Sequence, residues 1–127
     1  MERVAIYARE AQGRSGRARL GRQAAGLTAQ IARQSGWRHL ATYADQCLGA
    51  NRPGLSRLLA EAPGRVDLVV VDGYGRLAAN RQELGALLAH LGVLGVQVVV
   101  LRPSAGRRLA RLIANLALAD LIGDGLR

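Results

Sequence analysis

Short runs of apolar residues alternate along this chain with segments in which apolar residues recur every three or four positions. The runs have the length of β-strands, and the periodic segments have the length of helices. The predicted strands are residues 3–8, 39–43, 67–71 and 96–101. The predicted helices are residues 20–35, 53–62, 84–94 and 105–122, with loops over 12–19 and 45–52.

This alternation of strands and helices indicates the α/β class. We expect a three-layer sandwich with a mainly parallel sheet of four to five strands and a long C-terminal helix. The chain has 127 residues, half of them hydrophobic, which predicts a single domain over residues 1–127 with a packed core. No internal repeat or linker separates a second domain.

The positive charge of the chain comes from arginine. All 18 basic residues are arginines, and the formal net charge is +9. A guanidinium group pairs with phosphate through two hydrogen bonds, which favours a polyanionic partner. The same composition is also typical of a soluble protein from a GC-rich genome, so the charge alone leaves both interpretations open.

Other features of the composition argue against several classes of function. Cys47 is the only cysteine, so an internal disulfide is excluded and an inert thiol is expected. His39, His90 and Cys47 lack the spacing of metal ligands, and neither a metal nor a cofactor is expected. The chain has no signal peptide and no apolar run of about 18 residues, which predicts a cytoplasmic protein that does not enter a membrane.

The last predicted helix is apolar around most of its circumference. After Arg107, Arg108 and Arg111, its apolar residues fall on three stripes, and one sheet face covers only part of such a surface. We expect a homodimer or a heterodimer formed through this helix, with the alternative that the domain itself wraps around it. The predicted interface residues are Leu112, Ile113, Leu116, Leu118, Leu121 and Ile122.

Arginines also follow all four predicted strands, where open parallel sheets form their sites, and Arg102 comes directly after the fourth strand. Arg9 ends the first strand, Arg52 lies after the second, and Arg76 lies after the third. With few acids expected nearby, these arginines could hold a phosphate. Two alternatives stay open, namely that Arg9 is a solvated loop residue and that Arg76 pairs with Asp72.

Several short motifs occur in a characteristic order. Residues 7–11 read YAREA, 20–23 read LGRQ, 51–55 read NRPGL and 75–79 read GRLAA, and an Ala-Gly pair follows at 105–106. In order and spacing these motifs resemble the catalytic domain of the serine recombinases, the resolvase/invertase family. The family patterns are Tyr-Ala-Arg-x-Ser, Leu-x-x-Gln, Asp-Arg-x-Gly-Leu and Asp-Arg-Leu-x-Arg, with an Ala-Gly pair near the start of the final helix. The resemblance covers nearly the whole chain.

The resemblance implies a chemistry that this chain has lost. In active members a serine attacks a DNA phosphate and forms a covalent phosphoserine link, while arginines neutralise the developing charge. This chain has Ala11 at the position of the nucleophile, Gly75 at that of the acid and Ala79 at that of a second arginine. We therefore expect a catalytically inactive relative that acts by self-association, or by binding a partner recombinase or a DNA complex. The residues retained for phosphate or DNA binding are Arg9, Gln23, Arg52 and Arg76.

One active alternative stays open. The loop between Arg9 and Gln23 is longer than is usual in the family and contains Ser15, which a rearranged loop could present to phosphate. Family members usually carry a helix-turn-helix module before or after this domain, and no such module is predicted within residues 1–127. We expect only weak, salt-dependent contact with DNA phosphates. The residues that could make this contact are Arg14, Arg17, Arg19 and Arg22.

Overall fold

The computed structural model describes residues 1–47 and 49–101, and its elements follow the predicted alternation. The strands are β1 (Glu2–Arg9), β2 (Trp37–Asp45), β3 (Leu68–Val71) and β4 (Gln97–Val100). The helices are α1 (Arg14–Ala32), α2 (Pro53–Glu61), α3 (Arg81–Val93) and the short 3₁₀-helix η1 (Tyr74–Arg76). The predicted last helix, with its interface residues, lies outside the described residues.

The four strands of the described part form one parallel sheet in the order β2-β1-β3-β4. β1 and β3 are central, and every residue of β3 is buried. Strands buried on both faces carry continuous apolar runs, as the sequences VAIYA in β1 and LVVV in β3 do. The α/β class and the parallel sheet are therefore confirmed.

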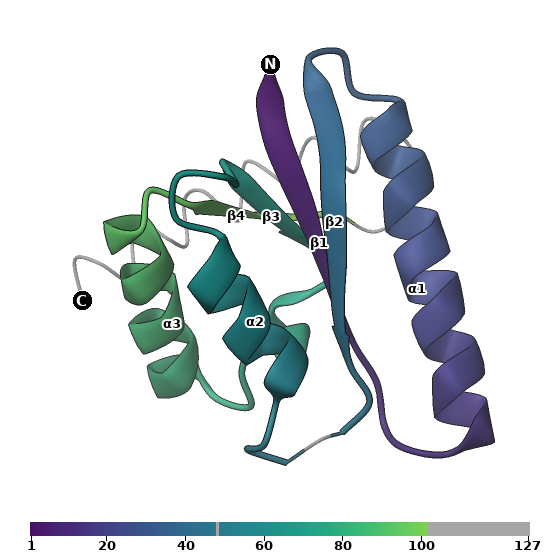
Figure 1. Cartoon of the computed structure of the whole chain (residues 1–127). Helices are drawn as coiled ribbons and strands as arrows, with labels where there is room; N and C mark the ends of the chain where they lie inside the picture. Colours follow the sequence, from purple (N-terminus) through teal and green to yellow (C-terminus); the bar gives the residue numbers. More distant parts are fainter. Residues whose placement is uncertain (48, 102–127) are drawn as a thin grey trace.

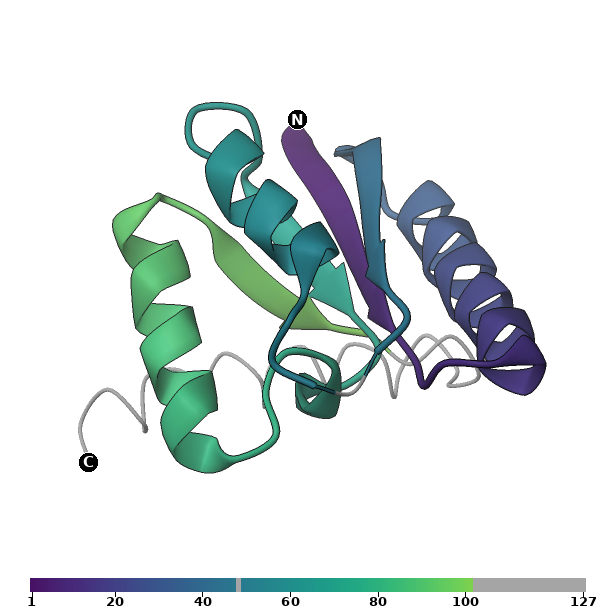
Figure 2. The same ribbon diagram turned by 60° about the horizontal axis from the view of Figure 1, so that its bottom comes forward.

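Different helices cover the two faces of this sheet (Figures 1 and 2). On one face, Val4 and Ile6 of β1 pack in a core that includes Leu27 of α1. Ala5 and Tyr7 of β1 point to the other face, into the core that α2 and α3 cover. Alternate residues of one strand thus enter two cores, which confirms the three-layer arrangement.

The loop predicted over residues 12–19 is wrong, because α1 already begins at Arg14. Gly13 has a φ of 101°, a conformation that favours glycine, where the connection from β1 enters the helix. At Gly16 an added Cβ would lie only 1.9 Å from the carbonyl oxygen of Ala11. These glycines serve a tight strand–helix connection rather than a flexible loop, and Ser15 lies exposed in the first turn of α1.

Other element boundaries differ from the prediction by a few residues. β2 extends from Trp37 to Asp45 rather than over 39–43, because the exposed Arg38 and the buried Asp45 of this edge strand are polar and limit the apolar run. α3 begins at Arg81, before its first leucine, since the side chain of Asn80 caps it by accepting a hydrogen bond from the Glu83 N–H at 2.9 Å. The short helix η1 was not predicted.

Candidate functional site

The carboxyl ends of the strands bring Arg9, Arg52 and Arg76 together, as the sequence predicted. Arg9 is the last residue of β1, Arg52 precedes α2, and Arg76 belongs to η1. Nη1 of Arg76 donates to the carbonyl oxygen of Arg9 at 3.0 Å, and Nη2 of Arg52 donates to the carbonyl oxygen of Arg76 at 2.8 Å. We call these three residues the arginine cluster.

Arg9 is the most buried member of the cluster, with only 7% of its surface exposed. Its Nε donates to the carbonyl oxygen of Cys47 at 2.9 Å, and its Nη2 donates to that of Gly49 at 3.1 Å. The side-chain amide of Gln23 bonds both backbone groups of Arg9, accepting from the N–H at 3.0 Å and donating to the carbonyl at 3.2 Å. Arg9 is therefore not a solvated loop residue, and Gln23 fastens the end of β1 to α1.

Arg52 is anchored to a buried phenol that the sequence analysis did not identify as a site residue. Its Nε and Nη2 donate to the hydroxyl of Tyr7 at 3.2 and 2.9 Å, and its guanidinium carbon lies 5.3 Å from the centre of the Tyr7 ring. Its Nη1 donates to the carbonyl oxygen of Leu77. Arg52 thus links β1 to the segment that follows η1.

Asp45 completes this network and was also missed. Its Oδ2 accepts from the Tyr7 hydroxyl at 2.7 Å, and the two carboxylate oxygens accept from the backbone N–H groups of Gly54 and Leu55 at the start of α2, at 2.7 and 2.9 Å. Burial, together with the hydrogen bond to Asp45, raises the pKa of Tyr7 well above its usual value, so the phenol stays protonated. The signal available in the sequence was a tyrosine inside a fully buried strand, because a buried hydroxyl needs a partner.

Arg76 is paired with acids, so the expectation of few acids near the cluster is wrong. Its Nε lies 2.7 Å from Oδ1 of Asp72, and its Nη1 lies 3.2 Å from Oε2 of Glu10. The pairing with Asp72 that the sequence left open is therefore present. The hydrogen bond to Asp72 raises the pKa of Arg76 further. Burial opposes ionisation of Glu10, but hydrogen bonds from the Ala11 N–H and Arg19, with the charge of Arg76, leave its pKa lowered.

The three positions at which the resemblance expects catalytic groups lie around this cluster. Ala11 is partly buried two residues beyond the end of β1, and its N–H donates to Oε1 of Glu10 at 3.3 Å. Gly75 is exposed in η1, with open space where a Cβ would lie. Ala79 is exposed, and its N–H donates to Oε2 of Glu83 at 3.3 Å. The side chains at these three positions carry no hydroxyl, carboxyl or guanidinium group.

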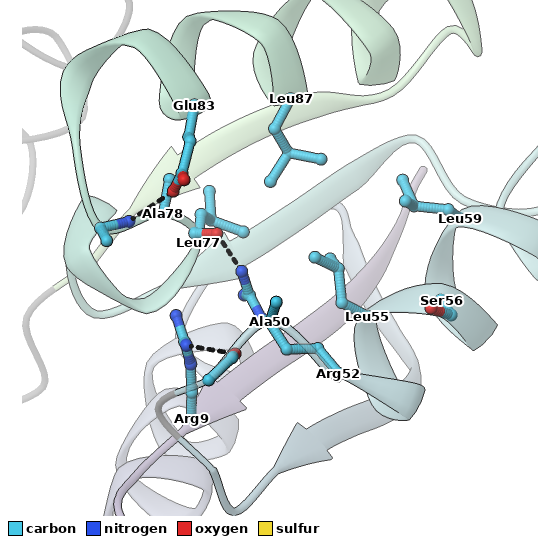
Figure 3. Close-up of a pocket in the computed structure, with 12 residues that line it drawn as sticks. Arg9, Ala50, Arg52, Leu55, Ser56, Leu59, Leu77, Ala78, Glu83 and Leu87 are labelled. Atoms are coloured by element: carbon cyan, nitrogen blue, oxygen red, sulfur yellow. Dashed lines mark hydrogen bonds between the residues drawn. The ribbon is translucent and has the colours of Figure 1, made fainter.

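A cavity of about 400 Å³ adjoins the cluster (Figure 3). Arg9 and Arg52 line it, together with residues of α2, of the segment after η1, and of α3. In the part of the chain that the structure describes, no group of three histidine, cysteine or acidic side chains is arranged to hold a metal ion. Within the same residues, no helix is long and apolar enough to cross a bilayer.

The fold and the site define a class of protein, which the comparisons with known proteins establish. The family model of the resolvase N-terminal domain matches residues 4–119, so the chain belongs to the resolvase family of recombinases. Among curated proteins, none matches the chain significantly.

Solved structures of serine recombinases share this fold. The C-terminal catalytic domain of ISC1926 TnpA, an IS607-like serine recombinase, is 26% identical with a TM-score of 0.69, over 90% of this chain and 77% of that one. The corresponding domain of IS1535 TnpA, also IS607-like, is 27% identical with a TM-score of 0.58, over 94% and 97%. The N-terminal catalytic domain of TP901-1 integrase is 23% identical with a TM-score of 0.68, over 93% and 92%.

Proposed function

We propose that this chain is a catalytically inactive serine-recombinase-like domain that acts by association, with itself, with a partner recombinase or with a recombinase–DNA complex. The observation that carries the proposal is Ala11 at the position of the nucleophile. A methyl group forms no bond to phosphorus, so the covalent intermediate cannot be made there. The absence of an acid at Gly75 and of an arginine at Ala79 points in the same direction.

The contacts of the arginine cluster support this proposal. Arg9 and Arg52 donate to backbone carbonyls and to a phenol, and Arg76 is held between two carboxylates. These bonds tie together β1, η1 and the loop before α2. The three arginines therefore have a structural role that needs no phosphate and no chemistry.

The surroundings of Ala11 make a substitute nucleophile from the same loop unfavourable. Gly16 of α1 packs directly on the carbonyl of Ala11, which fixes the short connection between β1 and α1. Ser15 lies on the exposed surface of α1, within a regular helix rather than in a loop free to rearrange.

A covalent-adduct assay tests the loss of chemistry. The chain is incubated with supercoiled DNA, denatured and examined for protein joined to DNA, beside an active serine recombinase with its own site. We expect no adduct from the wild type or from Ser15→Ala. An adduct from the wild type that disappears in Ser15→Ala would overturn the proposal.

Restoring the missing groups sharpens this test. Ala11→Ser alone is expected to stay inactive, because the acid and the second arginine are still missing. The triple variant Ala11→Ser, Gly75→Asp, Ala79→Arg adds all three groups. Gly75 and Ala79 are both exposed, so the larger side chains have room there. Adduct formation by the triple variant only would show that these three losses account for the inactivity.

Association is tested by sedimentation. We propose that the apolar segment 112–122 forms the contact, so the wild type is expected to sediment as a species larger than a monomer. Leu116→Asp should disperse this species, while the matched polar change Asn115→Asp should leave it intact. A wild type that stays monomeric, alone and when mixed with the catalytic domain of an active relative, would count against association.

The DNA contact proposed here is weak and does not depend on sequence. Four exposed arginines lie in the N-terminal half of α1, and one of them, Arg19, is paired with Glu10 at 3.3 Å. Contacts from such side chains to phosphates weaken as the salt concentration rises. Selection of a DNA site would then not rest on these contacts.

A further inference from the structure

The cavity beside the arginine cluster has two chemically different ends. Four leucines form an apolar wall of this cavity, namely Leu55, Leu59, Leu77 and Leu87. Figure 3 shows the side chains of Arg9 and Arg52 at the same cavity, with leucines of α2 and α3 around it. The cavity thus combines a cationic end with an apolar body.

The cationic end carries more positive than negative charge. Neither Arg9 nor Arg52 forms an ion pair with any residue that the structure describes, since their acceptors are carbonyl and phenol oxygens. The buried carboxylate of Asp45 reaches Arg52 only through the Tyr7 hydroxyl. Two guanidinium groups thus face one buried carboxylate at this end, while Glu83, the other acid at the cavity, bonds the Ala79 N–H and pairs with neither arginine, so an anion at Arg9 and Arg52 is favoured.

Arg9 also has a hydrogen-bond donor left for such an anion. Its Nε and Nη2 are bonded to carbonyls, whereas Nη1 has no acceptor among residues 1–47 and 49–101. Within the same residues no buried side-chain nitrogen lacks a partner, so Nη1 retains accessible surface although Arg9 is almost entirely buried. Because Arg9 lines the cavity, a ligand there can accept this bond.

We propose that the cavity binds a small amphipathic carboxylate, with its acid group at Arg9 and Arg52 and its apolar part against the leucines. A volume of about 400 Å³ lies within the range of small-molecule sites. A bare phosphate would leave the leucine wall in contact with water, and a neutral apolar molecule would leave Arg9 and Arg52 without an anionic partner. Ala11 does not line the cavity, so the site exists whether or not the chain has lost its chemistry.

Calorimetric titration of the full chain with octanoate, kept below its micelle-forming concentration, tests this site. We expect saturable one-to-one binding of octanoate. The neutral analogue 1-octanol and inorganic phosphate are each expected to bind at least about tenfold more weakly, because each lacks one of the two interactions. No DNA is used, so the result is independent of the adduct assay.

Two substitutions on α2 test the location. Ser56 is exposed and lines the cavity, so Ser56→Trp fills it and should weaken octanoate binding at least about tenfold. Ala60 is exposed on the same helix but does not line the cavity, so Ala60→Trp should change binding by less than about twofold. Circular dichroism and thermal melting confirm that both variants are folded.

A third variant tests the sign of the electrostatic effect. Glu83 also lines the cavity, and its carboxylate repels an anion there. Glu83→Gln keeps an oxygen that can accept from the Ala79 N–H and should strengthen octanoate binding by about two- to fivefold. The proposal is overturned if octanoate does not bind, if phosphate binds as tightly as octanoate, or if Ser56→Trp binds octanoate like the wild type.

Discussion

Arginines bond neighbouring segments at both ends of the parallel strands, but in different ways. We call the two ends the amino edge and the carboxyl edge of the sheet. At the amino edge, Arg3 of β1 meets Asp67 before β3, with Nη2 3.0 Å from Oδ1 and Nε 3.1 Å from Oδ2. One cation meets one anion, and both side chains are about one third exposed. At the carboxyl edge three guanidinium groups are packed into one network, and Arg9 is only 7% exposed.

The two edges differ in how their charged side chains are paired. At the amino edge, the ion pair of Arg3 and Asp67 links β1 to the start of β3, and the two charges neutralise each other. At the carboxyl edge the arginines bond the backbone of other segments, while Ala11, Gly75 and Ala79, on which the proposed loss of chemistry rests, carry no polar side chain. Arginines at such a site are therefore weak evidence of activity, because removing Arg9 or Arg52 would leave two backbone carbonyls without these donors, and removing Arg76 would take an ion-pair partner from Asp72 and Glu10.

The largest predicted effect is that of removing Asp45, a buried acid of the carboxyl edge. Asp45 is 3% exposed and accepts hydrogen bonds from Tyr7 and from two backbone N–H groups of α2. Asp45→Ala leaves these donors unsatisfied beside two arginines, and we expect a loss of about 3–5 kcal/mol in the free energy of unfolding, measured by urea denaturation.

The matched change at the amino edge is Asp67→Ala, which removes the acid of an exposed pair. Exposed ion pairs contribute little, so this variant should lose clearly less stability than Asp45→Ala. Equal losses would mean that the two edges do not differ in the way described.

The fold could be predicted from the sequence because its signals are local. Short unbroken runs rich in β-branched residues, such as LVVV, favour buried strands, and leucines at helical spacing mark α3. The prediction was wrong where glycine serves a contact rather than a bend. Gly13 and Gly16 suggested a flexible loop, whereas Gly13 supplies the positive φ before α1 and Gly16 permits the close approach of α1 to Ala11.

The site could be predicted only in part. The meeting of Arg9, Arg52 and Arg76 follows from the parallel direction of the strands, which the alternation of elements indicates. The acceptors of their hydrogen bonds do not follow, because Tyr7, Asp45 and Glu10 come together through packing between segments far apart in the sequence. Sequence patterns report which groups reach an edge, but not whether those groups are already bonded to one another.

A second prediction tests how rigid the carboxyl edge is. An added Cβ at Gly16 would lie 1.9 Å from a backbone oxygen, so Gly16→Ala must displace the strand–helix connection, at a cost of about 1–3 kcal/mol in the free energy of unfolding. Gly21, in the same helix, has open space at this position, and Gly21→Ala should instead stabilise the protein by about 0.5–1 kcal/mol. Opposite signs in urea denaturation are expected, and a neutral Gly16→Ala would show that the connection yields freely.

The smallest predicted effect concerns the amino edge and its response to acid. Hydrogen bonds from the Arg3 guanidinium and the Arg3 N–H lower the pKa of Asp67 from 3.8 to about 2. The unfolded chain therefore binds this proton more readily than the folded one, and the stabilisation is present above about pH 4 and lost as the pH falls towards 2.

Asp67→Asn removes this titration, so its melting temperature should fall less between pH 4 and pH 2 than that of the wild type. Part of the fall remains, because the pKa values of Glu10 and Glu61 are lowered as well. Arg3→Gln should flatten the profile less, because the backbone N–H of residue 3 still bonds Asp67, and the double variant should match Asp67→Asn. An Asp67→Asn profile as steep as that of the wild type would mean that this ion pair does not stabilise the amino edge, and the contrast between the two edges would then rest on the carboxyl edge alone.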